Sequence, residues 1–237
     1  MRIAIPSYQR STIIGTKTLA FLKGVDYPSE LITIFVANED EYLRYLQDVP
    51  NDLYGSLVIG ELGLKEQRNF ITNYYTNQQL LCCMDDDVDR IVCRNMSFQS
   101  LLAKARVDLE TQKSGLWGIL PKDDTRCFQN KTTTHLAHIL GSFYVCKNDR
   151  EIVTTTSEKE DYERSILYFK KYKKVLRFKG AGVRTRYAKT LGGLQQDGRL
   201  GRMAEEAIYL CKKYPDLCKR VDKHGMPDLF LNWRAVL

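Results

Sequence analysis

The chain has 237 residues, of which 43% are apolar and 11% aromatic. This composition is enough for one substantial core and argues against a disordered or fibrous protein. The longest apolar stretches fall far short of the roughly 20 residues that a membrane helix needs. The N-terminus opens into a β-rich run and has no signal-peptide region. We therefore expect a cytoplasmic protein without a membrane partner.

The net charge of +7 is concentrated in one region. Residues 170–220 contain 15 Lys and Arg but only 4 Asp and Glu, so the rest of the chain is slightly acidic. A charge run of this kind is usually a solvated face, but it also suits a polyanionic partner. Seven cysteines without a Cys-x-x-Cys spacing indicate reduced thiols, not a disulfide framework or a zinc ribbon.

Short β-rich runs alternate with helical stretches in the first half, which predicts βαβ units around a mainly parallel sheet. Strands are expected at residues 2–6, 31–37, 57–59 and 80–84, and helices at 16–23 and 64–75. Further along we expect a helix at 98–111, strands at 116–120, 139–146 and 175–178, and helices at 157–174 and 203–213. Glycines make residues 180–202 look like a loop, and Pro215 ends the last helix.

The strongest chemical signal is the run of Asp85, Asp86 and Asp87 directly after the buried strand at 80–84. The carboxyl edge of an open α/β sheet is where ligands bind. Crowded carboxylates repel each other unless a cation or hydrogen-bond donors compensate them, and Mg²⁺ or Mn²⁺ suits such oxygen ligands. The alternative is an acidic turn or helix cap. On the residues alone we favour the metal site.

The order of four segments resembles the GT-A glycosyltransferases. These segments are IPSYQR after the first strand, VANEDE at the end of the second, GLKEQRN leading into a helix, and DDDV after the buried strand. The resemblance covers about the first 90 residues and implies a nucleotide-sugar donor with Mn²⁺ or Mg²⁺, and UDP is the commonest donor nucleotide of this fold. Asp85 and Asp87 would be the Asp-x-Asp metal pair. The nucleotide sugar would lie against these residues: Pro6, Ser7, Tyr8, Arg10, Asn38, Glu39, Arg68, Asn69, Asp85 and Asp86. Taken singly, each of these residues is better explained by a structural role. Taken in order they favour the functional one, because all would converge on the same sheet edge.

In its compact size and its basic C-terminal third, the chain resembles the glycosyltransferases associated with TET/JBP oxygenases. This group includes enzymes that glycosylate hydroxymethylpyrimidines in DNA. This resemblance implies a DNA acceptor. The residues that would contact its phosphates are Arg177, Lys179, Arg184, Arg186, Lys189 and Arg199. We accordingly divide the chain into a catalytic core at 1–178 and a basic extension at 179–237 that packs on the core and faces the acceptor.

A second acidic group, Glu158, Glu160 and Asp161, precedes a helical stretch. Inverting GT-A enzymes commonly place a carboxylate base at such a position, where it takes the proton of the attacking hydroxyl. Ser157 and Glu160 have the spacing of a capping box. Glu160 therefore has a competing role, and Asp161 is the first choice for the base. The pattern is equally consistent with a purely structural role, in which these acids only interact favourably with the dipole at the helix N-terminus.

The three histidines, His135, His138 and His224, lie beside no second ligand motif, so none is assigned to the metal. Two other functions compete with the glycosyltransferase. A nucleotidyltransferase would also use a metal and a nucleotide, but it normally has a glycine-rich signature after the first strand. A non-catalytic nucleic-acid-binding module would explain the basic region, but no zinc-finger, RNP or helix-turn-helix signature accompanies the charge.

Overall fold

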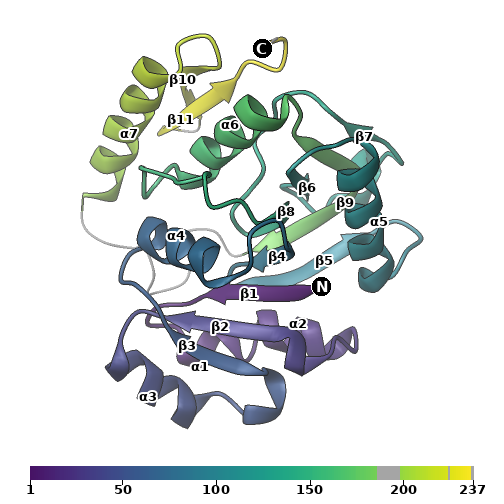
Figure 1. Cartoon of the computed structure of the whole chain (residues 1–237), viewed down its shortest axis with the longest axis vertical. Helices are drawn as coiled ribbons and strands as arrows, with labels where there is room; N and C mark the ends of the chain where they lie inside the picture. The colour runs from purple at the N-terminus through teal and green to yellow at the C-terminus, as the bar shows by residue number, and fades with distance from the viewer. Residues whose placement is uncertain (186–197, 224, 236–237) are drawn as a thin grey trace.

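The computed structural model describes residues 1–185, 198–223 and 225–235. Within them, one mixed sheet is enclosed by two layers of helices (Figure 1). Its strands are β1 (Arg2–Pro6), β2 (Ile32–Val36), β3 (Ser56–Ile59), β4 (Leu80–Met84), β5 (Val88–Cys93), β6 (Leu116–Leu120), β7 (Thr132–Thr133), β8 (Phe143–Lys147) and β9 (Leu176–Thr185).

The helices that connect these strands and cover both faces of the sheet are α1 (Ser11–Ile14), α2 (Thr18–Gly24), α3 (Glu39–Asp48), α4 (Leu64–Tyr74), α5 (Phe98–Thr111) and α6 (Glu160–Tyr172). Helix α7 (Arg199–Lys213) follows β9. Short 3₁₀ turns are η1 (Ser29–Leu31), η2 (Asn51–Leu53) and η3 (Thr125–Cys127). A separate hairpin of β10 (Cys218–Lys223) and β11 (Met226–Leu231) follows α7.

The strand order is β3-β2-β1-β4-β8-β6-β9-β5, with β7 paired to β9. The first four strands run parallel, as the alternating pattern predicts. Beyond β4 the sheet is mixed, because β8 runs antiparallel to both β4 and β6, and β5 antiparallel to β9. The carboxyl ends of β1, β2, β3 and β4 therefore meet at one edge of the sheet.

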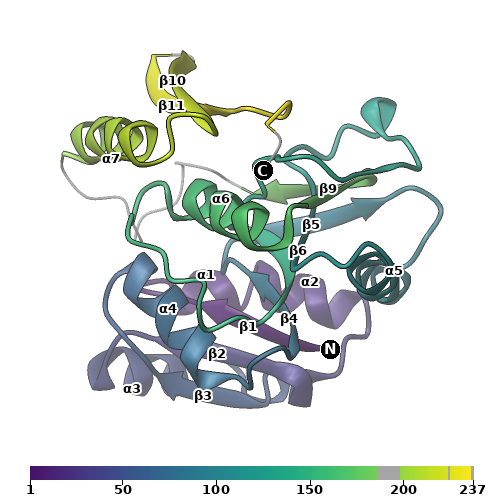
Figure 2. The same cartoon turned by 45° about the horizontal axis from the view of Figure 1, so that its top comes forward.

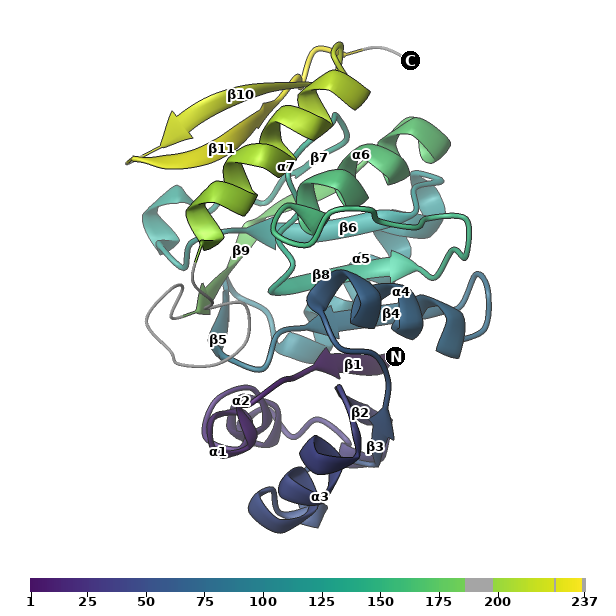
Figure 3. The ribbon, with the colours of Figure 1, turned by 90° about the vertical axis from the view of Figure 1, so that its left-hand side faces the viewer.

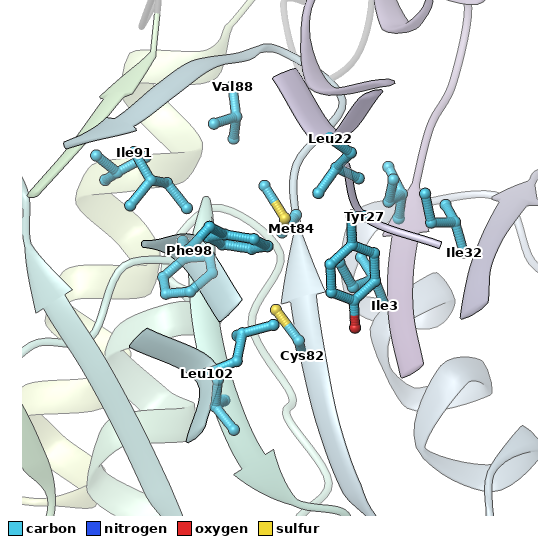
Figure 4. Close-up of a cluster of buried hydrophobic side chains, with 14 of the residues drawn as sticks. Ile3, Leu22, Tyr27, Ile32, Cys82, Met84, Val88, Ile91, Phe98 and Leu102 are labelled. Carbon is cyan, nitrogen blue, oxygen red and sulfur yellow. The ribbon is translucent and has the colours of Figure 1, made fainter. Parts of the chain in front are cut away.

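Alternate side chains of each strand enter two different cores. Ile3, Cys82 and Met84 face the layer of α1, α2, α3 and α5, where Phe98 of α5 packs edge-on against Tyr27 (Figure 4). On the other face, Ala4 and the neighbouring strand positions pack against α4 and α6. This two-residue period is what fixes the register of β4 and presents its C-terminal end at the sheet edge.

The C-terminal unit of α7 and the hairpin lies over α6 and not over the sheet (Figures 2 and 3). Helix α7 ends at Lys213, two residues before Pro215, as predicted. The hairpin was not predicted, because four of the six residues of β10 are charged and only Leu229 and Leu231 of β11 are buried.

Several predicted bounds were wrong. The strand expected at 139–146 begins only at Phe143, and the helix expected from Ser157 begins at Glu160. Residues 180–185 were taken for a loop but continue β9, which runs through the expected core boundary at residue 178. The glycines there reflect close packing, since a Cβ atom on Gly182 would lie 1.9 Å from the carbonyl oxygen of Lys122.

Candidate active site

The polar candidates gather where three parallel strands end. β1 ends at Pro6 before Ser7, β2 ends at Val36, and β4 ends at Met84 directly before Asp85. Because β1 pairs in parallel with both β2 and β4, these ends meet at one edge. The topology therefore brings the aspartate run next to the loop after the first strand.

The three aspartates differ in exposure. The Asp86 side chain is only 5% exposed, and it accepts a hydrogen bond of 2.5 Å from the Ser7 hydroxyl and one of 2.8 Å from Nη1 of Arg10. The side chains of Asp85 and Asp87 are 33% and 13% exposed. The middle carboxylate thus anchors the loop, while the first and third remain accessible.

Burial raises the affinity of Asp86 and Asp87 for protons. Burial, and then the charges of Asp85 and Asp86, raise the pKa of Asp87 to about 7. Burial also raises the pKa of Asp86, although the nearby Arg10 opposes this effect. Negative charge that the protein compensates so incompletely favours a bound cation.

The donors present fit a divalent cation. Asp85 and Asp87 supply hard carboxylate oxygens, the ligands that Mg²⁺ and Mn²⁺ prefer. Among the described residues, no group of three or more His, Cys, Asp and Glu side chains is arranged to hold a metal. Mg²⁺ is commonly held by one or two carboxylates, with substrate phosphate and water as the other ligands. The pair therefore suits a metal shared with a diphosphate, not a closed protein site.

Arg68 joins the aspartate run to the second half of the chain. Its side chain is 4% exposed, and Nη2 donates to Asp85 Oδ1 at 2.6 Å and to the carbonyl oxygen of Gly141 at 3.0 Å. We expected Arg68 and Asn69 to contact the nucleoside. The Asn69 amide donates to the carbonyl of Thr154 and accepts from its N–H, at 3.0 and 3.2 Å. Both side chains thus already have partners within the protein.

The other predicted nucleotide contacts lie along the same edge. Pro6 is buried and Tyr8 is half-buried, next to Ser7 and Arg10 in the loop after β1. Asn38 and Glu39 are exposed at the start of α3, where the Asn38 side chain caps the helix by accepting from Glu41 N–H at 3.0 Å. The structure brings these side chains to the edge where the aspartate run lies.

Asp161 lies beside Gly141, which Arg68 contacts on its other side. Asp161 Oδ2 accepts from the Gly141 N–H at 3.3 Å and bonds to His138 Nε2 at 2.7 Å, while Oδ1 accepts from the Tyr162 N–H at 2.9 Å. A Cβ atom at position 141 would lie 3.8 Å from Asp161 Cβ. The predicted base and the predicted metal pair are therefore connected through Arg68 and Gly141.

Burial alone would raise the pKa of Asp161. Contact with His138, the charge of Arg164 and the Gly141 N–H together lower this pKa well below its ordinary value. The carboxylate is therefore charged at neutral pH, and its affinity for a proton is low.

Glu160 does not form the predicted capping box. Its buried carboxylate instead contacts Arg164 Nη1 at 2.6 Å and lies 3.9 Å from Arg68 Nε. Both arginines flank the Tyr144 ring, with the Cζ atom of Arg164 3.8 Å from its centroid. The prediction failed because two buried guanidinium groups, from α4 and α6, compete for this acid. The cavity beside them, about 20 Å³, has room for one water and not for a nucleotide.

The C-terminal unit holds the segment that leads into α6. The carboxylate of Glu206, on α7, accepts from the backbone N–H groups of Ser157, Glu158 and Lys159 at 2.7 to 2.9 Å. Further contacts between this unit and the start of α6 are ion pairs and hydrogen bonds of Glu158 with Arg199 and Arg202, Glu163 with Lys213, Lys159 with Asp228, and Tyr162 with Asp228. We call these contacts, together with those of Glu206, the α6 clamp.

The six basic residues expected at DNA do not form one described surface. Arg177 and Lys179 lie near the N-terminal end of β9 and are partly buried, whereas Arg184 lies near its other end, 3.5 Å from Asp123. Arg199 is paired with Glu158 in the α6 clamp at 3.0 Å. Arg186 and Lys189 lie outside the described residues.

No protein-family model matches the sequence, and no curated protein is significantly similar to it. Solved structures do match. Residues 1–349 of TarS from S. aureus are 14% identical with a TM-score of 0.50, covering 91% of this chain and 72% of that one. The Mycobacterium tuberculosis glucosyl-3-phosphoglycerate synthase, solved with Mn²⁺, UDP and its product, is 10% identical with a TM-score of 0.54, covering 97% and 86%. The chain has the GT-A fold.

A third similar structure is the mannosyltransferase PcManGT of Pyrobaculum calidifontis with GDP-Man and Mn²⁺. It is 14% identical with a TM-score of 0.50, and the match covers 90% of this chain and 62% of that one. At such low identity the likeness establishes the architecture alone, which confirms the fold that the ordered motifs implied. In the described part of the chain, no helix is long and apolar enough to cross a membrane.

Sequence reasoning did not anticipate the roles of His138 and Glu206. His138 lies within a run without a recognisable motif, and Glu206 is one of two adjacent glutamates on an amphipathic helix. The one signal that could have drawn attention to His138 is its position shortly before β8 and the acidic start of α6.

Proposed function

We propose that the chain is a metal-dependent glycosyltransferase that moves a sugar from a nucleoside diphosphate, most simply UDP, to an acceptor hydroxyl. The observation that carries this proposal is the exposure pattern of the aspartate run. Asp85 and Asp87 remain accessible at the carboxyl edge of a GT-A sheet, while Asp86 is fixed by Ser7 and Arg10.

The residues have separate roles in this proposal. Asp85 and Asp87 would hold Mn²⁺ or Mg²⁺, which stabilises charge on the departing diphosphate when bound. Arg10 and Arg68 hold the aspartates in place. Tyr8, Asn38 and Glu39 lie where the nucleoside would bind. Asp161, with its bonded partner His138, would serve the acceptor hydroxyl.

Calorimetry with UDP, with and without Mn²⁺, tests the donor half of this proposal. We expect binding that requires the metal and that Asp87→Ala removes. A screen of nucleotide sugars for hydrolysis then identifies the sugar. Binding of nucleoside triphosphates with release of pyrophosphate would favour the nucleotidyltransferase, and metal-independent binding of nucleic acid alone would favour the binding module.

The acceptor stays a prediction from charge. A DNA acceptor carrying hydroxymethylpyrimidines would be approached from the major groove or after base flipping. Of the six basic residues, Arg184 is exposed near the edge of the sheet where the aspartate run lies. β9 runs parallel to β6, and β6 has the same direction as β4 because both are antiparallel to β8. Filter binding at several salt concentrations tests this idea. The logarithm of the binding constant should fall linearly with the logarithm of the salt concentration, with a slope of roughly −0.9 for each duplex phosphate that the protein neutralises. No affinity at low salt, with efficient glycosylation of a small molecule, protein or glycan, would exclude DNA.

We also propose that the part beyond residue 178 serves the acceptor. In support, α7 and the hairpin pack over α6 and contact the segment that precedes Asp161. The strand β9, which spans residue 178, belongs to the central sheet.

A further inference from the structure

We propose that His138, and not Asp161, takes the proton of the acceptor hydroxyl, while Asp161 orients and stabilises the imidazole. This inference rests on the proposed function and names the residue that performs its proton transfer. It also assigns a role to a histidine that the sequence reading left as structural.

Both oxygens of Asp161 are already engaged. Oδ1 accepts from the Tyr162 N–H, and Oδ2 bonds to His138 and to the Gly141 N–H. A carboxylate held by three partners has little capacity left for an incoming hydroxyl. Its pKa, lowered by His138, Arg164 and Gly141 against the effect of burial, makes it a weak base as well.

His138 is held in one orientation by the start of α6. Its ring stacks on Tyr162 with centroids 3.6 Å apart and planes 10° from parallel. The next backbone N–H, of Ile139, donates to the Ser165 hydroxyl at 3.0 Å. Because the Asp161 carboxylate accepts at Nε2, that nitrogen carries the hydrogen and Nδ1 carries the lone pair. Within the described residues, no hydrogen bond engages Nδ1.

His138 and Asp161 are partly accessible and are linked to the predicted metal pair. The side chains of His138 and Asp161 are 24% and 20% exposed. Arg68 links the site to Asp85 through the carbonyl of Gly141, whose N–H contacts Asp161. The imidazole is therefore partly exposed, within a fixed frame that also holds a predicted metal ligand.

The charged and titratable groups around His138 come from two elements. From α6 these are Asp161, the stacked Tyr162, and Arg164 one turn further on. From β11, Asp228 accepts from the Tyr162 hydroxyl at 2.7 Å, and it also contacts Lys159 beside the same ring. Asp161 is the acid in direct contact, and it favours the protonated imidazole that the reaction forms.

The proton transfer balances without another reactant. The acceptor O–H bond breaks and its proton passes to Nδ1 of His138, while the acceptor oxygen bonds to the anomeric carbon of the donor sugar. The bond from that carbon to the diphosphate breaks, and its electron pair leaves with the nucleoside diphosphate. The imidazolium then releases the proton to water. A direct displacement of this kind inverts the anomeric configuration.

The test uses the full chain, Mn²⁺, UDP-glucose or the best donor of the screen, and water as the acceptor. His138→Gln keeps an N–H donor for Asp161 but has no basic nitrogen, so turnover should fall by about 10² to 10⁴-fold. Metal-dependent UDP binding should not change. The matched control is His135→Gln, three residues upstream and in edge-to-face contact with Trp233, which should keep wild-type turnover.

Two further readouts separate a base from a structural role. Substituted imidazoles should restore turnover to His138→Gly in proportion to their basicity. In the wild type, kcat/KM should fall on acidification because a protonated base cannot take the proton of the acceptor, and His138→Gln should lose this dependence on pH. Wild-type turnover of His138→Gln, or retention of configuration in the product, would overturn the proposal. Loss of UDP binding in the wild type itself would instead overturn the proposed function.

Discussion

The donor edge and the acceptor side of this molecule are built in different ways. At the donor edge, Ser7, Asn38 and Asp85 lie together because three parallel strands end there. On the acceptor side, the start of α6 is held by side chains from α7 and β11 that lie 41 to 69 residues away in sequence. The first arrangement follows from strand topology and the second from side-chain packing, so substitutions should separate nucleotide binding from turnover.

The largest effect should come from the donor edge. Asp87→Ala removes an accessible carboxylate at the metal pair, and Asp85→Ala should be nearly as severe. We expect Mn²⁺-dependent UDP binding to weaken by about 100-fold or more, since loss of even an outer-shell partner commonly costs 10 to 100-fold. Calorimetry measures this directly. The control is Asp52→Ala, an exposed acid paired with Lys23. Wild-type activity of Asp87→Ala at saturating Mn²⁺ would disprove the metal assignment.

The buried ion pairs between the two regions should affect stability before function. Glu160→Gln leaves Arg164 without its carboxylate partner at 2.6 Å and removes the negative charge near Arg68. Breaking a buried pair in this way typically destabilises by about 3 kcal/mol or more. Urea denaturation should show this loss, with UDP binding retained by the folded fraction. Glu151→Gln, in an exposed pair with Lys171, is the control. Normal stability with abolished turnover would instead make Glu160 a catalytic group.

A smaller effect is expected from the α6 clamp. Glu206→Ala removes the carboxylate that accepts from three backbone N–H groups, and losing a hydrogen bond to a charged group costs about 1.5 kcal/mol. Because these residues lead directly into the start of α6, where Asp161 lies, turnover should fall several-fold while UDP binding is unchanged. Glu205→Ala changes the exposed neighbour on the same helix and should be silent. Equal losses in both variants would show that α7 contributes only its charge and not the hydrogen bonds of Glu206.

The same comparison explains how far the sequence could be interpreted. Strands such as β1, β4 and β6 matched their apolar runs residue for residue, and the order of motifs at their ends implied the GT-A fold. The metal pair could be proposed because residues after parallel strands must meet. The capping box failed because Arg164 and Arg68 engage Glu160, and no local spacing reveals that competition.

The acceptor side remained unpredicted for the same reason. The contacts of His138 with Asp161 and of Glu206 with Ser157 join segments 23 and 49 residues apart, across loops whose path no periodic pattern specifies. β5 and the β10–β11 hairpin were also missed, since their exposed faces carry charges that interrupt a hydrophobic run.

The smallest effect concerns the hairpin and should appear only in acid. Burial alone would raise the pKa of Asp228, but the Tyr162 hydroxyl, Lys223 and Lys159 lower it to about 2. Since this folded value lies below the roughly 3.9 of an unfolded Asp, the ionised group stabilises the fold above pH 4, and this stabilisation is lost as pH falls from about 4 to 2. Hydrogen exchange of β10 and β11 should therefore accelerate over that window before exchange in β1 and β4 does. Asp228→Asn should remove the part of the pH dependence that is specific to the hairpin, and simultaneous exchange of both regions would show that the hairpin does not unfold separately.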